Sequence, residues 1–453
     1  MLCPHRMQTM EGFVVTEETA TRMVEYDAGP VLPFHRRLVL SASSGSFSDG
    51  YVLGVTGIAL AVATDTMDIS DTWQGLLGSS TLAGLFFGAL ICGRLVDRFG
   101  RQPFFGPLML IFTLVSLLQL LTSPDWSLLI VRFIMGLLLG GDYVSSKALL
   151  AEVSPRHWRG RALGALGFAW TLGFAAAYIV GLLMRDLGPD SWKWILATSA
   201  IPSIISFALR IGAPESPRWL VQNGRVAEAR KIVTSRMGAN YNLPETAPKS
   251  VEPSLRALFR SDTARSTFIA CLVYTVAVMP TFALGTFLPR VVETLGVENP
   301  YTGSLGYYCC AAIGPFLGLL VIDRLSRRTM AFGGFLVSGL LLLPLMISGA
   351  SPLFIVLVFA TFALVTKATS TVGYVYPSEL FSTELRGRGV GLAVASSRFG
   401  ASALTFFMPI VVGNFGVVAA LAMCVAVLLA GGVVGYIWAP ETSSRALDPA
   451  ASS

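Results

Sequence analysis

The sequence has very little charge for its length. Of its 453 residues, 13% are charged and 53% are hydrophobic, whereas about a quarter are charged in a typical soluble domain. So few polar side chains cannot cover a surface that faces water, and we predict an integral membrane protein surrounded by the lipid bilayer. The net charge of +6 does not indicate a nucleic-acid partner, because the position of the charges matters more than their sum.

Histidine and cysteine are also scarce. The three histidines, His5, His35 and His157, lie outside the long apolar stretches, so no imidazole is available there as a proton carrier. Five of the six cysteines lie within those stretches, without the spacing of a metal site. The sequence also has no nucleotide-binding loop and no nucleophile–base set. We therefore expect no metal, no cofactor and no enzymatic activity.

Long apolar stretches are abundant. Twelve of them have about the 20 residues that an α-helix needs to cross a bilayer. Such segments must be helical, because lipid offers no hydrogen-bond partners to the backbone. The expected fold is an all-α membrane protein with twelve transmembrane helices. Their predicted spans are 38–63, 73–93, 103–122, 127–150, 161–184, 192–211, 266–290, 302–322, 329–348, 352–376, 388–411 and 414–438.

The polar segments divide the chain into parts. We expect the N-terminal tail to be loose, and the central loop contains a candidate amphipathic stretch, "GRVAEARKIVTSRM". The predicted parts are an N-terminal tail (1–37), an N-terminal six-helix half (38–211), a central loop (212–265), a C-terminal six-helix half (266–438) and a C-terminal tail (439–453).

Lysine and arginine predict the orientation. Cytoplasmic connections of membrane proteins carry an excess of these residues. All but seven of the 33 lie in the tails and the even-numbered connections. We therefore expect both termini and the central loop to be cytoplasmic. The short loops and the lack of an organellar presequence favour a bacterial inner membrane, with a eukaryotic plasma membrane as the alternative, and we expect a monomer.

Three motifs recur at an almost constant distance of 226 or 227 residues. "GRLVDRFGRQ" matches "GLLVIDRLSRRT", "AEVSPRHWRGRALG" matches "SELFSTELRGRGVG", and "APESPRW" matches "APETSSR". A parallel duplication of six helices is typical of transporters, whose substrate site lies near mid-membrane between the halves. The matched positions are Asp97 with Asp323, Glu152 with Glu379, and 159–161 with 386–388.

The charges in these repeated connections predict a gate on the cytoplasmic side. Asp97 can pair with a base of a neighbouring helix, and Arg98 and Arg101 can pair with Glu152 or Glu215. Positive-inside topology alone would explain the arginines, but not the aspartate, the glycines or the duplication. The predicted gating residues are Gly93, Asp97, Arg98, Gly100, Arg101, Glu152, Arg159, Arg161, Asp323, Arg324, Glu379, Arg386 and Arg388.

These motifs together resemble the major facilitator superfamily. "GxLxDRxGR" after the second span, "E-x-x-P…RGR" after the fourth and "PESPRWL" after the sixth are similar to its sugar-porter and phosphate:proton-symporter branch. The resemblance covers residues 38–443 and implies a transporter of two six-helix halves. Two positions depart from the pattern: Ser326 stands where glycine is usual, so that turn can differ in shape, and Gln102 replaces a base.

Asp49 is the first candidate for proton coupling. It lies about 12 residues into the first span, which places it about 18 Å deep in the membrane. At that depth an isolated carboxylate lacks the water that would stabilise its negative charge, so it can take up and release a proton. "SGSFSDGYVLG" resembles the stretch in phosphate symporters whose first acid is implicated in coupling. The alternative is a structural aspartate at a helix break between Gly45 and Gly50.

Asp142 and Arg132 are the other coupling candidates. "GGDY" at Asp142 resembles the phosphate-symporter signature, although Val144 replaces its proline and Lys147 has no place in the pattern. Asp142 either shares proton coupling with Asp49 or is a structural partner of a base. Sugar porters carry an arginine near the position of Arg132, which implies that it pairs with Asp49; an arginine that snorkels to the helix end is the alternative.

Lys367 and Arg398 are the candidate substrate ligands. Both lie near mid-membrane in the second half, and the duplicated positions in the first half are Gly140 and Thr171. Unmatched buried bases in a duplicated frame indicate an anionic ligand, because the arginine fork fits a carboxylate or phosphate. Pairing with Asp49 or Asp142 across the halves is the alternative. Aromatic residues suit a ring-bearing ligand but also serve as packing; those predicted here are Tyr143, Trp170 and Tyr274.

We therefore predict a secondary active transporter that moves a small organic anion, such as an aromatic or sugar acid, by alternating access with proton symport. The seventh span lacks the aspartate of phosphate symporters, which weakens inorganic phosphate as the substrate. Two alternatives stay open: a neutral sugar or polyol symporter, in which the bases only tune the acids, and a proton-coupled exporter of organic compounds.

Overall fold

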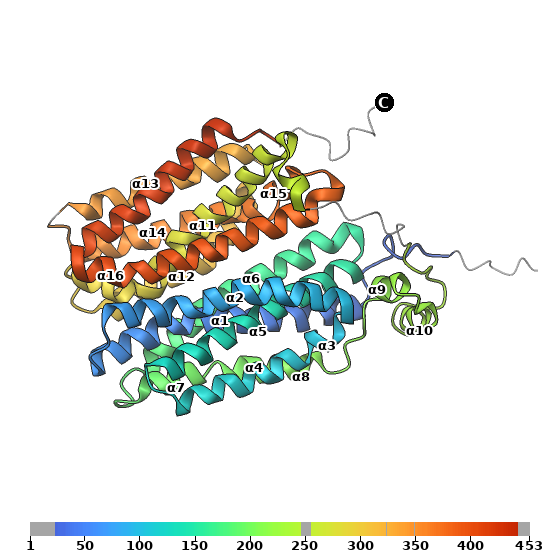
Figure 1. Cartoon of the computed structure of the whole chain (residues 1–453), viewed down its shortest axis with the longest axis horizontal. Helices are drawn as coiled ribbons and strands as arrows, with labels where there is room; N and C mark the ends of the chain where they lie inside the picture. The colour runs from blue at the N-terminus through green and yellow to red at the C-terminus, as the bar shows by residue number, and fades with distance from the viewer. Residues whose placement is uncertain (1–22, 246–254, 323, 348, 443–453) are drawn as a thin grey trace, which may run out of the picture.

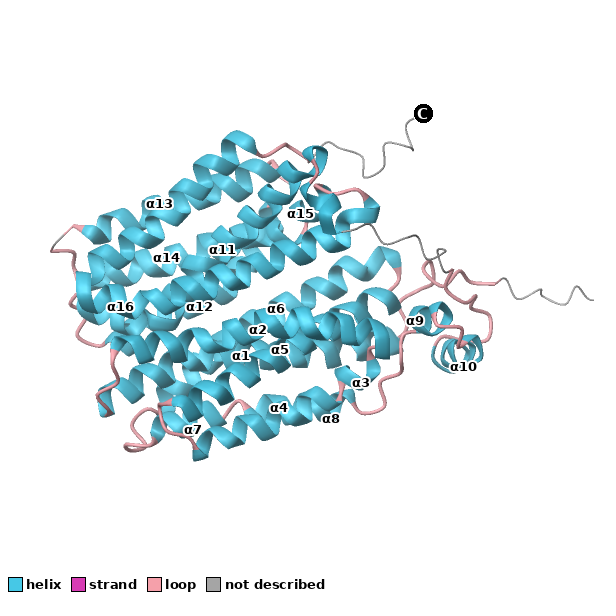
Figure 2. Ribbon diagram, viewed as in Figure 1, coloured by secondary structure: helices cyan, strands magenta, loops and turns pink. Residues whose placement is uncertain are grey.

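The computed structural model describes residues 23–245, 255–322, 324–347 and 349–442, which form helices and connecting loops (Figures 1 and 2). Two groups of long helices lie along the same direction. The first group consists of α1 (Pro33–Thr66), α2 (Asp71–Phe99), α3 (Gln102–Phe105), α4 (Pro107–Leu118), α5 (Trp126–Val153), α6 (Arg156–Met184), α7 (Ser191–Ala197) and α8 (Ala200–Arg210). The second consists of α11 (Ser261–Thr294), α12 (Pro300–Val321), α13 (Gly334–Leu342), α14 (Pro352–Ser370), α15 (Tyr376–Glu379) and α16 (Thr383–Trp438).

Eleven helical segments of the described residues are long and apolar enough to cross a membrane. The last of them, Leu385–Trp438, covers both the eleventh and the twelfth predicted spans. The helical path breaks at Gly416, whose φ of +83° lies in the left-handed region that glycine adopts without a steric penalty. The expected all-α fold with twelve crossings is confirmed. This break separates the eleventh crossing from the twelfth. It lies a few residues beyond 412–413, the connection predicted between these two spans.

Close helix packing holds each group together. In the first group α2 and α5 approach at Gly84 and Gly136, where a Cβ atom would lie 2.2 Å from the backbone oxygens of Phe133 and Thr81, respectively. Only glycine permits this approach, and small residues are the usual means by which helices pack closely in lipid. The same packing fixes the position of α5, which carries Asp142 and Tyr143.

The two groups contact each other near the ends where α1 and α11 finish, which we call the far end. Arg290 on α11 donates to Asp71 at 2.6 Å and to Gln74 at 2.5 Å, both on α2. The Tyr178 hydroxyl on α6 donates to the carbonyl of Tyr301 on α12 at 2.8 Å. The two halves are thus linked directly at the far end.

The opposite end, which we call the tail end, carries α9 (Pro217–Gln222) and α10 (Val226–Arg236) (Figure 1). The expectation of a loose tail is wrong for residues 23–32, whereas residues 1–22 lie outside the described part. Val24 forms a bridge with Tyr241, and Tyr26 packs against Val233 and Met237. Burial raises the pKa of the Tyr26 hydroxyl. The tail is held because its apolar side chains match the apolar face of α10.

Candidate functional site

Arg101 organises the tail end of the first half. Its guanidinium pairs with Glu152 at 2.7 Å and Asp97 at 3.2 Å, and donates to the carbonyl of Val96 at 3.2 Å. The Glu215 carboxylate accepts from the backbone N–H groups of residues 101 and 102, at 3.0 and 3.1 Å. The turn itself passes through Gly100, whose φ is +100°. These contacts join the ends of α2, α5 and the segment after α8.

The second half repeats four of these contacts, between the residues at the equivalent positions. Arg327 pairs with Glu379 at 3.6 Å and donates to the carbonyl of Ile322 at 2.6 Å. The Glu441 carboxylate accepts from the backbone N–H groups of residues 327 and 328, at 3.0 and 3.3 Å. The duplication seen in the sequence therefore extends to individual hydrogen bonds.

The other predicted gating residues occupy varied positions. Arg159 pairs with Asp27 at 3.3 Å, and Asp27 also pairs with Arg156 and Arg218. The sequence analysis missed Asp27, which lies in the tail that was expected to be loose. Asp323 lies outside the described residues. Of the rest, Arg98, Arg161 and Arg324 are exposed, and Gly93, Arg386 and Arg388 are half-buried.

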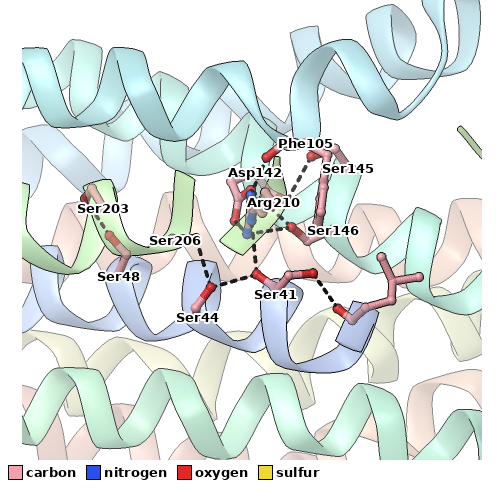
Figure 3. A network of polar contacts seen from close by, with 11 residues as sticks. Ser41, Ser44, Ser48, Phe105, Asp142, Ser145, Ser146, Ser203, Ser206 and Arg210 are labelled. Carbon is pink, nitrogen blue, oxygen red and sulfur yellow. Dashed lines mark hydrogen bonds and ion pairs between the residues drawn. The ribbon is translucent and has the colours of Figure 1, made fainter. Parts of the chain in front are cut away.

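Two acids, Asp49 and Asp142, and one arginine, Arg210, are buried together in the first half. Figure 3 shows Asp142 and Arg210. Asp142 pairs with Arg210, one contact between them being 3.2 Å, and both side chains are completely enclosed. Asp49 lies within hydrogen-bonding reach of Asp142, and its Oδ1 atom has no partner. The arginine thus pairs with Asp142, and Asp49 lies next to this pair.

Arg210 is held from several sides. Its guanidinium also donates to the carbonyls of Phe105 at 2.6 Å and Ser41 at 3.1 Å, and to the Ser146 hydroxyl at 3.2 Å (Figure 3). The sequence analysis missed this residue as a partner of Asp142. The sequence did contain a signal for it, because Arg210 lies inside the predicted sixth span. Arg210 was instead counted among the basic residues of the cytoplasmic connection that follows this span.

Arg132 does not contact Asp49 in this structure. It donates to the Thr56 hydroxyl, to Gln119 Oε1 at 3.3 Å and to the carbonyl of Val52 at 3.4 Å. The side chain is 1% exposed, so it does not snorkel to the membrane surface. The structure places Arg210, not Arg132, against the acid pair.

A row of small polar side chains joins α1 to α8 beside the cluster. The Ser44 hydroxyl donates to that of Ser206 at 3.1 Å, and the hydroxyls of Ser48 and Ser203 lie 2.7 Å apart (Figure 3). Hydroxyl pairs of this kind link helices in lipid at a gain of about 1 kcal/mol each. They fix α1, and with it Asp49, against α8, which ends at Arg210.

Lys367 and Arg398 face aromatic rings that the opposite half contributes in part. The Lys367 Nζ atom lies 5.1 Å from the ring centre of Trp170 and 5.8 Å from that of Phe174, both on α6. The Arg398 Cζ atom lies 5.9 Å from the ring centre of Tyr143 on α5, and 5.8 Å from that of Phe282 on α11. Lys367 is 9% exposed and Arg398 is half-buried.

Three of the four aromatic residues around these cations form one group. Trp170 and Phe174 stack at 5.5 Å, and Phe282 meets Trp170 edge-on at 5.9 Å. Phe282 and Phe174 were not among the predicted ligands. Tyr274 was among the predicted ligands, but it packs against a separate cluster around Phe381 and Ala393. The structure therefore brings Tyr143 and Trp170 to the two cations, but places Tyr274 elsewhere.

A cavity of about 710 Å³ lies at the far end, away from these residues. Its walls come from both halves and include Asp65, Arg185, Arg290 and Glu293. Arg290 closes one side of it through the ion pair with Asp71. The cavity therefore lies beside the contact between the halves, and none of the predicted substrate ligands lines it.

Comparison with known proteins agrees with this architecture. A family model described as "Sugar (and other) transporter" matches residues 38–452. The inner membrane metabolite transport protein YgcS of Escherichia coli K12 is 37% identical over 429 residues, which cover 94% of this chain and 96% of that protein.

Solved structures show the same fold. A partially occluded, inward-open form of the xylose transporter XylE from Escherichia coli superposes with a TM-score of 0.76 at 19% identity, over 92% of this chain and all of that one. A D-xylose-proton symporter gives a TM-score of 0.75 at 19% identity, over 90% of this chain and 99% of that one.

The family match and the 37% identical relative, together with two groups of membrane-spanning helices, define a transporter of the major facilitator superfamily. Within that superfamily, the chain belongs to the sugar (and other) transporter family, as its family match over residues 38–452 shows. It is a multi-pass membrane protein of a family whose bacterial members include inner-membrane transporters.

Proposed function

We propose that the protein carries a small organic anion across a bacterial inner membrane, coupled to protons, by alternating access between its two halves. One observation carries the proposal. Lys367 and Arg398 lie between the halves, and among the described ion pairs neither has an acid as partner. Because a buried charge is costly, a substrate anion is the natural counter-charge for them.

The aromatic rings add to this argument. They attract the two cations through the negative face of the ring, and each such contact contributes about 0.5–2 kcal/mol. This is much less than a carboxylate provides, so the rings hold the cations in place without neutralising them. An anion can then compete for both. The rings also suit an organic substrate with an apolar part.

Asp49 is the proposed proton carrier. Asp142 and Arg210 neutralise each other, so a charged Asp49 would add an uncompensated negative charge in the buried cluster. Protonation of Asp49 removes that charge and lets its hydroxyl donate to Asp142. Arg132 on α5 contacts α1 at Val52 and Thr56 rather than at Asp49, and we assign it to holding α1 in place.

The contacts at the two ends support an assignment of the conformation. The arginine-rich tail end is proposed to face the cytoplasm. The halves are joined at the far end by Arg290 with Asp71 and Gln74, whereas the ion pairs of Arg101 and Arg327 each stay within one half. We propose that this conformation is closed to the outside, with the far-end contacts as the outer gate.

A neutral sugar or polyol symporter is the second candidate. The solved structures of similar fold include a D-xylose-proton symporter. In this case Lys367 and Arg398 would only influence the ionisation of the acids in the first half and would not contact the substrate. Asp142 pairs with Arg210 rather than with either of these cations, which favours the anion.

Purified protein in liposomes distinguishes the candidates. Uptake of a labelled sugar acid and of the corresponding neutral sugar is measured for the wild type, Lys367→Gln, Arg398→Gln and a control, Lys231→Gln, on the exposed face of α10. We expect uptake of the acid, a rise in its KM of at least tenfold in Lys367→Gln and Arg398→Gln, and no change in Lys231→Gln. Preferred uptake of the neutral sugar, unaltered by either substitution, would refute the proposal.

A further inference from the structure

The hydroxyl group of Tyr143 lies between two cations. The Lys147 Nζ atom, one helical turn further along α5, is 3.6 Å from the centre of the Tyr143 ring, and the Arg398 Cζ atom is 5.9 Å from it. The tyrosine side chain is within hydrogen-bonding reach of both cations. Ammonium and guanidinium groups only donate, so the hydroxyl oxygen accepts from both. Its two lone pairs are then in use, and its own O–H is left to donate to a third group.

The backbone around Tyr143 holds the side chain in this place. A Cβ atom at Gly140 would lie 2.4 Å from the backbone nitrogen of Ala89, so α5 is in direct contact with α2 just before Tyr143. Asp142, the preceding residue, is anchored inside the first half by its ion pair with Arg210. Tyr143 is therefore a fixed part of the first half, and its hydroxyl reaches the cation of the second half.

The other side chains around the two substrate cations carry no oxygen. Lys367 faces the rings of Trp170 and Phe174, and Arg398 faces that of Phe282. The one polar atom of these three rings is the indole nitrogen of Trp170, whose N–H is a donor and not an acceptor. In the described part of the chain, these contacts of Lys367 and Arg398 thus supply donors and apolar rings.

The acids of the first half do not change this property. The side chains of Asp49 and Asp142 belong to residues that are 2% and 0% exposed. Asp142 pairs with Arg210, and Asp49 lies next to that pair. Both carboxyl groups are enclosed within the first half, so an acidic group that is bound between the halves meets donors.

A site made of donors distinguishes acids that carry an O–H from acids that do not. Every oxygen of a carboxylate or a sulfonate accepts, so each donor finds a partner. A phosphonate with a single negative charge keeps one O–H, and this group needs an acceptor. Where the surrounding groups are all donors, its hydrogen stays unpaired, which costs binding free energy.

We propose that the acidic group of the substrate is an oxyanion without a hydrogen, either a carboxylate or a sulfonate, and that the Tyr143 hydroxyl donates to it directly. Lys147 is the positioning residue, because it occupies a lone pair of the hydroxyl and so turns the O–H towards the substrate. Groups that keep an O–H, such as a singly charged phosphonate, are rejected. The inference rests on the proposed function, because it assumes that Lys367 and Arg398 bind an anion.

The experiment compares sulfonates with phosphonates that have the same organic part: methyl, propyl and phenyl. The pH is mildly acidic, so that each phosphonate has one negative charge and one O–H, and the two members of a pair agree in charge and shape. Isothermal titration of the purified protein gives the Kd values. In the wild type we expect the sulfonate of at least one pair to bind at least about ten times more tightly than the phosphonate.

Two variants test the part of the Tyr143 hydroxyl. Lys147→Met releases one lone pair of the hydroxyl, which can then accept from the phosphonate, so the preference should fall to about twofold. The lost charge affects both ligands alike, because they carry the same charge. Tyr143→Phe removes a donor without adding an acceptor, so both ligands should bind several times more weakly while the preference stays. The control, Lys231→Met on the exposed face of α10, should change neither value.

The outcomes separate the inference from the proposed function. Equal affinity within each pair in the wild type, or tighter binding of the phosphonates, would overturn the inference and leave the proposed function intact. An unchanged preference in Lys147→Met would overturn it as well. If Lys147→Met does not fold, the wild type and Tyr143→Phe decide, since unaltered affinities in Tyr143→Phe would exclude the hydroxyl as a donor. Failure of every acid to bind would overturn the proposed function itself.

Discussion

The two halves of the molecule are alike at the tail end and differ at the centre. At the tail end, Arg101, Glu152 and Glu215 make the same contacts as Arg327, Glu379 and Glu441. The offsets between these positions, 226 or 227 residues, are those of the sequence motifs. A duplicated gene has kept these bonds in both copies.

At the centre, each charged position of one copy is uncharged in the other. Asp49, Asp142 and Arg210 of the first half correspond, at the same offsets, to Thr275, Thr369 and Tyr436. Conversely, Lys367 and Arg398 of the second half correspond to Gly140 and Thr171. The first half therefore holds the two buried acids, and the second half holds the two cations that we assign to the substrate.

The comparison separates what the fold requires from what the activity requires. Both halves need the tail-end contacts, since each must hold the ends of its own helices together while it moves as a unit. Only one half needs a proton carrier, and an anion site needs cations that are not already neutralised. The unmatched residues at the centre are accordingly those that we assign to transport.

The largest effect is expected when the buried pair of the first half is broken. Asp142→Asn leaves the enclosed Arg210 without a counter-charge, which costs about 3–5 kcal/mol of stability. Its counterpart, Thr369→Ser, keeps a hydroxyl and should cost less than about 1 kcal/mol. Thermal unfolding in detergent measures both variants. Similar melting temperatures for the two would contradict the enclosed ion pair.

A matched pair of substitutions tests the likeness of the tail ends. Glu152→Gln and Glu379→Gln each remove the charge that faces Arg101 or Arg327, so each should lower stability by about 1–3 kcal/mol. Because the contacts are equivalent, we expect the two losses to agree within about twofold. A large loss of stability in one variant with none in the other would show that the duplicated bonds contribute unequally to stability.

The far-end contact is expected to have a smaller effect on stability but a clear effect on conformation. Asp71→Asn weakens a partly exposed ion pair, which contributes about 0.2–1 kcal/mol. Opening of the far end should then make a cysteine introduced at Thr286, which lines the far-end cavity, react several times faster with a membrane-impermeant thiol reagent. Glu379→Gln is the control, and equal labelling rates in both variants would exclude an outer gate at Arg290.

The reciprocal exchange of Gly100 and Ser326 should give the smallest effect in the second half. Ser326→Gly loses the bond from the Thr329 N–H to the serine hydroxyl, which costs about 0.5 kcal/mol or less. Gly100→Ser must adopt a φ near +100° with its Cβ atom 2.2 Å from Glu215, and should cost more. Melting temperatures compare the two; a greater loss in Ser326→Gly would mean that the two turns have been assigned wrongly.

The sequence predicted the helices and the duplication well, because the length of an apolar stretch and the spacing of motifs depend only on the order of residues. Partners that meet in space were harder to predict. Arg210 lies at the end of its span, and only the packing of α8 against α1 and α4 brings it to Asp142. Residues 23–32 seemed loose because so short a segment gives no sequence signal for the apolar cluster that it forms with α10. Tyr274 has the right depth but faces a different cluster.

The most direct test of the account measures uptake and exchange of the anion in liposomes with an imposed acid gradient. The account predicts that external acid drives accumulation in the wild type, and that Asp49→Asn abolishes this accumulation while exchange of labelled for unlabelled anion continues. Accumulation that ignores the gradient, or that persists unchanged in Asp49→Asn, would contradict the assignment of protons to the first half and the anion to the second.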